Sequence, residues 1–164
     1  MIIMKNLILI RHAKSSWDAP VKDIDRPIND RGIKDAHLVA SNFKNSIPST
    51  FLIQCSAAKR ANETALIFAE TILYPIENIV FKEELYTFDE SKLEKIIKSS
   101  SNDFENCILF GHNEAITNFV NKFGDIYIDN VPTSGLVWLQ FDTDNWDKIN
   151  KGKTKKTIFP TNLK

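Results

Sequence analysis

Leu7-Ile8-Leu9-Ile10-Arg11-His12 is the stretch that decides the fold, because an uninterrupted apolar run ends here in two residues that suit an anion. Branched and aliphatic residues in a row, with no helical period, predict a strand that is buried on both faces. Such strands are typical of parallel sheets that are covered by helices on each side. The stretch therefore predicts an α/β protein in which a guanidinium and an imidazole lie at the carboxyl end of a central strand.

Two further apolar runs end in polar residues of the same kind. Residues 51–55 lead into a segment that contains Arg60, and residues 107–110 lead into Gly111-His112-Asn113. In an open parallel sheet, ligands bind outside the carboxyl ends of the strands. We therefore expect the side chains that follow these three strands to converge on one site.

The order of elements along the chain supports the same fold class. The pattern predicts strands over 5–10, 51–55, 79–81, 107–110, 136–141 and 157–159, and helices over 31–45, 58–73, 91–99 and the residues after His112. Alternating strands and helices predict a mostly parallel open sheet with helices on both faces, formed as one domain over residues 1–164. We expect residues 11–29 to be loop, and the lysine-rich segment 148–156 to be a solvated surface loop.

Composition limits the function classes. The chain has 164 residues, 43% of them hydrophobic, and its 21 Lys and Arg balance its 21 Asp and Glu. This balance gives no global basic field that would favour a nucleic acid or a membrane surface as partner. No stretch resembles a signal peptide or a membrane span, so we expect a cytoplasmic protein. Cys55 and Cys107 lie inside expected strands and are interpreted as small buried residues without redox chemistry.

The residue types at the three strand ends suit a phosphoryl group. Arginine matches phosphate with two parallel hydrogen bonds and stays charged, so Arg11 and Arg60 can hold two sides of one phosphate, and His112 can add a third donor. His12 is the candidate nucleophile, because a neutral imidazole can attack phosphorus. The nearby arginines should lower the pKa of His12 and so keep it neutral. For His37, in the middle of an expected helix, we favour a structural role.

These motifs together resemble the histidine phosphatase superfamily. The stretch Arg11-His12-Ala13-Lys14-Ser15 is similar to its Arg-His-Gly signature, with alanine in place of glycine. Residues 56–65 resemble its Ser-x-x-x-Arg-Ala-x-x-Thr-Ala motif, and residues 111–113 its Gly-His-Asn motif. The short chain and residues 25–32 look like the SixA-type phosphohistidine phosphatases. The resemblance implies a phosphoglycerate mutase-like fold.

The resemblance also implies roles for individual residues. His12 is then the phosphorylated nucleophile, and Arg11, Arg60 and His112 hold the phosphate. Ser15, Asp18 and Asn113 are further candidates for substrate binding. The general acid is left open between Glu84, Glu83 and Asp18, all present in segments where related enzymes carry site residues.

The expected function is hydrolysis of phosphohistidine or another phosphoramidate, on a protein or on a small molecule, without a metal or cofactor. About nine residues between Phe81 and Ser91 are too few for a cap over the pocket. Alternatives are a phosphatase for sugar or nucleotide phosphates, a non-catalytic phosphate-binding module, and a metal-dependent hydrolase. In the last case His12, His112, Asp18 and Glu84 would be the ligands.

Overall fold

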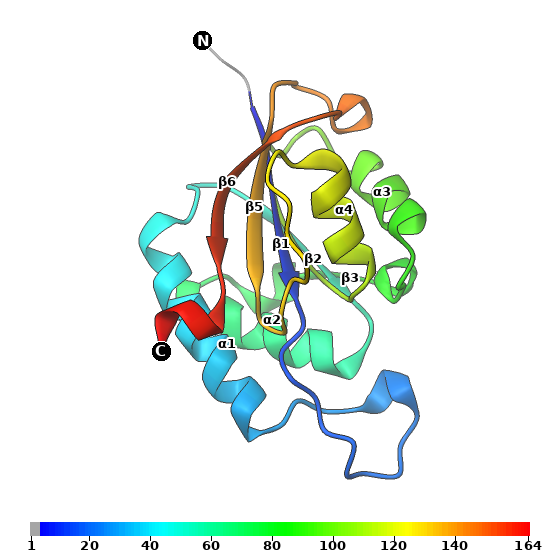
Figure 1. Cartoon of the computed structure of the whole chain (residues 1–164), viewed down its shortest axis with the longest axis vertical. Coiled ribbons are helices and arrows are strands. Elements are labelled where there is room, and N and C mark those ends of the chain that lie inside the picture. Colours follow the sequence, from blue (N-terminus) through cyan, green and yellow to red (C-terminus); the bar gives the residue numbers. More distant parts are fainter. Residues whose placement is uncertain (1–3) are drawn as a thin grey trace.

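The computed structural model describes residues 4–164, which form a mixed sheet between two layers of helices (Figure 1). The strands are β1 Lys5–Arg11, β2 Leu52–Ser56, β3 Val80–Lys82, β4 Asn106–Gly111, β5 Leu136–Phe141 and β6 Lys153–Ile158, in the spatial order β3-β2-β4-β1-β5-β6. The helices are α1 Asp30–Phe43, α2 Lys59–Ile72, α3 Glu90–Lys98 and α4 Ala115–Phe123. The pairings among β1, β2, β3 and β4 are parallel, whereas β5 and β6 are antiparallel to their neighbours. The predicted α/β class is confirmed.

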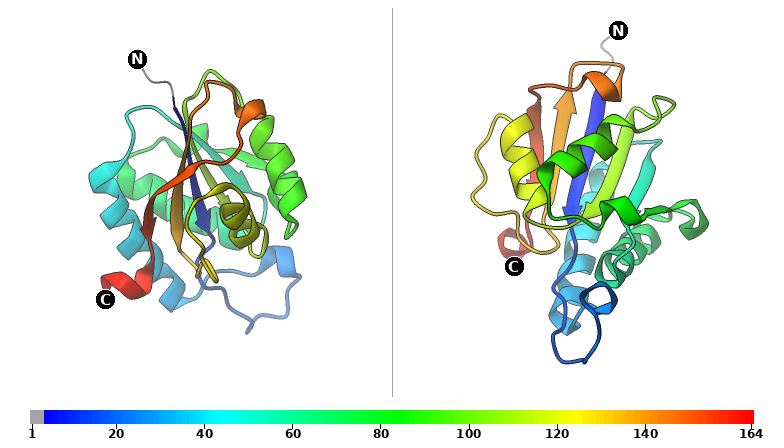
Figure 2. Two further views of the ribbon diagram at one scale, coloured as in Figure 1. Left: turned by 45° about the horizontal axis from the view of Figure 1, so that its top comes forward. Right: turned by 90° about the vertical axis from the view of Figure 1, so that its right-hand side faces the viewer.

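The alternation of side chains along β1 explains why helices cover both faces of the sheet. Ile8 and Ile10 are fully buried in the cluster that contains the apolar residues of α1 and α2. Leu7 and Leu9 are fully buried in the second cluster, with α3 and α4. Figure 2 shows the two helical layers on opposite sides of the sheet. Burial on both faces accounts for the continuous apolar run in the sequence.

The loop after β1 is held against the start of α1. The Asn29 side chain caps this helix by accepting the Gly32 N–H at 2.8 Å, and the Asn29 N–H donates to the Lys14 carbonyl at 2.9 Å. A Cβ atom at Gly32 would lie 2.3 Å from the Lys14 oxygen, so only glycine allows this approach. The first residues after the strand are thereby positioned by a helix on the far side of the loop.

Two local expectations are wrong. The segment 148–156 is not all loop, since β6 begins at Lys153 and forms the sheet edge beside β5. Exposure alternates along β6, so Lys153 and Lys155 face solvent at this edge, whereas Lys156 is half-buried; a count of charges alone does not reveal this alternation. Residues 11–29 also contain a short 3₁₀ turn, Asp23–Asp25.

Over residues 4–164 we find no helix that is long and apolar enough to span a membrane. Cys55 and Cys107 are buried and unbridged, as expected.

Candidate active site

The sheet register brings three strand ends together. Arg11 at the end of β1 pairs with Gly111 at the end of β4, so His12 and His112 follow side by side, with ring centroids 5.2 Å apart. Strand β2 pairs with the other edge of β4. Its last residue, Ser56, places a hydroxyl 2.7 Å from Nε2 of His112. The parallel pairing therefore places the candidate residues at one edge of the sheet.

His12 is held with one ring nitrogen directed into the site. Its Nδ1 donates a hydrogen bond of 2.7 Å to the Ala13 carbonyl, which leaves Nε2 with a lone pair. Arg60 Nε donates to this Nε2 at 3.4 Å. Burial lowers the pKa of His12 to about 4, and the charges of Arg60, Arg11 and Arg26 act in the same direction. His12 is therefore neutral at pH 7, and burial contributes more to this state than the arginines on which the sequence argument relied.

His112 is buried next to His12, with only 1% of its surface exposed. Burial lowers its pKa to about 3, with further lowering by His12 and Arg60. The Ser56 hydroxyl accepts the Ala58 N–H at 3.2 Å, so its own proton can go to Nε2 of His112. In that arrangement the proton of His112 is on Nδ1, which is buried and has no hydrogen-bond partner. The structure therefore leaves one N–H of His112 without a protein partner, although His112 is not among the residues that line the pocket described below.

Arg60 is oriented by a carboxylate that the sequence analysis did not single out. Its Nη1 donates to the Asp23 carbonyl at 2.6 Å, and its Nη2 donates to the Asp23 carboxylate at 3.0 Å. These bonds engage both terminal nitrogens of the guanidinium, whereas Nε donates to His12. Only 2% of the Arg60 side chain is exposed. Asp23 thus holds Arg60 so that one edge of the guanidinium is directed at the candidate nucleophile.

Asp23 has two more partners. Arg26 Nε donates to its carboxylate at 3.2 Å, and the Tyr86 hydroxyl donates to the same group. Burial raises the pKa of Asp23, but hydrogen bonds from Tyr86 and Arg60 outweigh it and lower the pKa to about 2. Arg26 stacks on the Trp17 ring, 3.4 Å from its centroid. Of these residues, Arg26 lies in segment 25–32, which resembles the SixA-type phosphatases, whereas no sequence pattern points to Asp23.

The helix after β2 also fixes the peptide that follows His12. The Thr64 hydroxyl accepts the Ala13 N–H at 2.8 Å and donates to the Arg60 carbonyl at 2.7 Å. Ala13 is fully buried. The position where the superfamily signature has glycine therefore accommodates a methyl group in the packed interior.

The residues surround an open pocket of about 280 Å³. Of the sequence candidates, those that line it are Arg11, His12, Ser15, Arg60 and Asn113, and the others that line it are Lys14, Trp17, Asp23, Arg26, Phe88 and Thr133. The Ser15 hydroxyl accepts from Arg26 at 2.8 Å, and the Asn113 amide donates to Asn130 at 2.8 Å. Ser15 and Asn113 are thus present in the pocket but are already engaged with protein groups.

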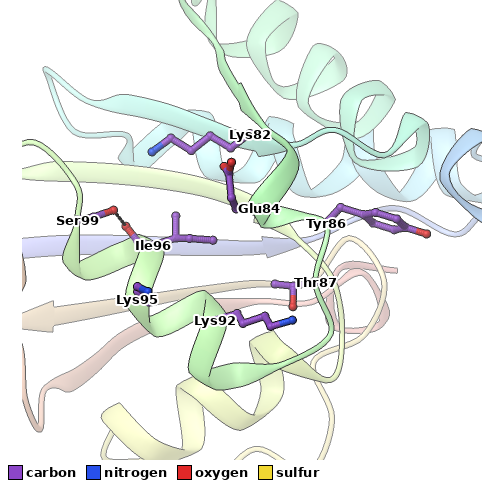
Figure 3. Close-up of a pocket in the computed structure, with 8 residues that line it drawn as sticks. All are labelled: Lys82, Glu84, Tyr86, Thr87, Lys92, Lys95, Ile96 and Ser99. Atoms are coloured by element: carbon purple, nitrogen blue, oxygen red, sulfur yellow. Dashed lines mark hydrogen bonds between the residues drawn. The ribbon is translucent and has the colours of Figure 1, made fainter.

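The three acid candidates are not brought into this pocket. Asp18 and Glu83 are exposed and do not line it. Glu84 lies in a separate hollow of about 550 Å³ between the end of β3 and α3 (Figure 3). The position of Glu84 in the chain, shortly after β3, does not indicate which of these two neighbouring cavities its side chain lines. No cluster of three or more metal-ligating side chains is found within the described part of the chain.

Comparison with known proteins places this site in a family context. The family model of the histidine phosphatase superfamily (branch 1) matches residues 7–96. An uncharacterised protein of Mycobacterium leprae is 30% identical over 112 residues, which cover 66% of each chain. An uncharacterised chloroplastic protein of Arabidopsis thaliana is 29% identical over 155 residues, 89% of this chain and 71% of the relative. The alignment with the Mycobacterium leprae protein thus spans slightly less than two thirds of that relative.

Solved structures share the fold. The protein histidine phosphatase SixA complexed with tungstate superposes with a TM-score of 0.82 at 19% identity, over 97% of this chain and 99% of that one. Phosphoglycerate mutase from Bacillus anthracis gives a TM-score of 0.69 at 11% identity, over 90% and 96% of the two chains. A mycobacterial glucosyl-3-phosphoglycerate phosphatase gives 0.68 at 11% identity, over 93% and 97%. At these identities the likeness establishes the fold alone.

Proposed function

Because the chain belongs to the histidine phosphatase superfamily, we propose that it is a phosphatase that hydrolyses phosphohistidine or another phosphoramidate through a phosphorylated His12. The observation that carries the proposal is the position of His12 Nε2, which is unprotonated, lies next to Arg60 Nε and lines a pocket with three arginines. A neutral nucleophile beside fixed positive charge suits attack on an anionic phosphoryl group.

In this proposal the phosphate oxygens bind Arg11, Arg60 and the Nδ1–H of His112. His12 Nε2 attacks phosphorus, and the bond from phosphorus to the substrate nitrogen breaks with its electron pair going to that nitrogen. In phosphohistidine the other ring nitrogen already carries a proton, so a neutral imidazole leaves. Water then attacks the phosphorylated His12, which releases inorganic phosphate and restores Nε2. Charge that spreads over the phosphoryl oxygens during both steps is stabilised by the same fixed donors.

The absence of a protonated acid among the described residues of the pocket favours a nitrogen leaving group. Among the described residues that line the pocket, Asp23 is the one carboxylate, and its pKa of about 2 keeps it ionised at neutral pH. An ionised carboxylate cannot protonate a leaving alkoxide, which an alkyl ester requires in the transition state. The imidazole ring of phosphohistidine can be protonated before the bond breaks, at the nitrogen that is not bonded to phosphorus, so it leaves as a neutral group. The fold is shared with a protein named protein histidine phosphatase SixA, and a substrate of this class for the present chain agrees with that likeness.

The test is a comparison of three substrates under one condition: phosphoramidate, an aryl phosphate and an alkyl phosphate. We expect efficient, moderate and poor hydrolysis in that order, with all activity lost in His12→Ala. A preference for sugar or other alkyl phosphates would contradict the proposal and favour a phosphatase for small monoesters. A cytoplasmic location and independence from metal ions stay predictions.

A further inference from the structure

The hollow that contains Glu84, beside the candidate active site, carries positive charge that is not paired with carboxylates. Lys82 comes from the β3 side, and Lys92 and Lys95 come from α3 on the opposite side (Figure 3). None of the three forms an ion pair with a carboxylate in the described residues. Glu84 is the one carboxylate among the residues that line the hollow. The hollow is therefore a positively charged surface that a negatively charged group can bind.

The charges of α3 are segregated between its sides. Glu94 is paired with Lys122 at 2.8 Å and with Lys98 at 3.1 Å, and Glu90 is 3.8 Å from Lys122. These acidic side chains are thus neutralised by lysines, including one from α4. The lysines that line the hollow have no such compensation, so their charge is available to a partner.

The hollow adjoins the phosphate pocket through one side chain. Tyr86 lines the hollow, and its hydroxyl donates to Asp23 in the phosphate pocket. The centroid of its ring lies 5.4 Å from that of the His112 ring. Two residues later, Phe88 lines the phosphate pocket itself. A molecule whose phosphate reaches His12 and whose body extends beyond the pocket therefore lies close to the hollow.

We propose that this hollow binds an acidic segment of a phosphorylated protein whose phosphohistidine enters the adjacent pocket. The proposal rests on the proposed function and specifies its substrate. A phosphoprotein covers surface around the inserted side chain, whereas a small phosphoramidate fills the pocket alone. Complementary charge outside the reacting centre raises the rate of encounter and selects the partner. The carboxylate of Glu84 opposes an acidic segment, so its removal should improve binding.

The experiment uses two peptides that each carry one phosphohistidine, flanked either by glutamates or by glutamines. The wild-type protein should hydrolyse the acidic peptide with a kcat/KM about tenfold higher than that for the neutral peptide, and this advantage should disappear at high salt.

The variants test whether the lysines cause this preference. The triple variant Lys82→Glu, Lys92→Glu, Lys95→Glu should lose the advantage through KM and keep its activity on phosphoramidate. Glu84→Gln should raise the advantage. The matched control reverses three exposed lysines elsewhere, Lys34→Glu, Lys44→Glu and Lys153→Glu, and should retain the preference.

Equal kcat/KM for the two peptides, or an equal loss in the control variant, would overturn the proposal. Binding of the unphosphorylated acidic peptide, followed by fluorescence anisotropy, tests docking separately from turnover and should weaken in the triple variant alone. If ATP competes with the acidic peptide and displaces it, the hollow binds a small phosphorylated molecule instead, and the proposal is overturned. Failure of the proposed function is distinguishable, because wild-type protein would then hydrolyse neither phosphoramidate nor the neutral peptide.

Discussion

Lowering the pH from 7 to 5 should destabilise the fold through the two buried site histidines. Burial lowers the pKa of His12 to about 4 and that of His112 to about 3. In the unfolded chain both have a pKa of about 6.5, so at pH 5 the unfolded state binds two protons that the folded state does not. Linkage then lowers the free energy of unfolding by about 2 kcal/mol for each histidine between pH 7 and pH 5, or by about 4 kcal/mol for the two together.

The sign follows from the direction of the pKa shifts. A histidine whose folded pKa is lowered contributes no penalty above pH 6.5 and an increasing penalty as the pH falls toward its folded pKa. Chemical denaturation at pH 7, 6 and 5, in a buffer without phosphate, measures this loss directly. Phosphate is omitted because a ligand of the folded state would stabilise it.

Variants separate the contribution of the two site histidines to this loss of stability from that of other titratable groups. His12→Asn and His112→Asn should each remove about half of the drop between pH 7 and pH 5, whatever their stability at pH 7. His37→Gln is the matched control, since His37 is exposed on α1, and should leave the drop unchanged. A stability that stays constant between pH 7 and pH 5, or a drop that survives in both site variants, would refute the reasoning.

Three further predictions concern the site. Arg60→Ala should lower kcat/KM on the order of hundreds-fold, as expected for loss of one preorganised charged donor, and steady-state kinetics on phosphoramidate measure this. Asp23→Asn should lower kcat/KM up to about tenfold, since Arg60 loses the carboxylate that orients it, whereas Asp25→Asn in the same turn should change little. Prolonged treatment with EDTA should leave activity unchanged, because the arginines supply the positive charge; restoration of lost activity by a divalent ion would contradict this.

The sequence predicts the sheet and the strand-end residues because both follow from local patterns. The apolar run before Arg11 is continuous since β1 is buried on both faces. Parallel pairing then requires the ends of β1, β4 and β2 to lie together.

The sequence does not predict the contacts that the loop after β1 makes. Asp23 reaches Arg60 and Tyr86 across 37 and 63 positions of the chain. The position of Glu84 depends in the same way on how the short turn after β3 is oriented, which places it in the neighbouring hollow. Side chains on irregular segments are positioned by tertiary packing, and their spacing along the chain carries little of that information.

The most direct test of the account is whether His12 carries the phosphoryl group during turnover. Rapid quenching of wild-type protein with labelled substrate should trap a phosphate that is labile in acid and stable in base, and peptide mapping should place it on His12. The His12→Ala variant should show neither label nor activity. Full activity in that variant, or a label that maps to another residue, would contradict the account.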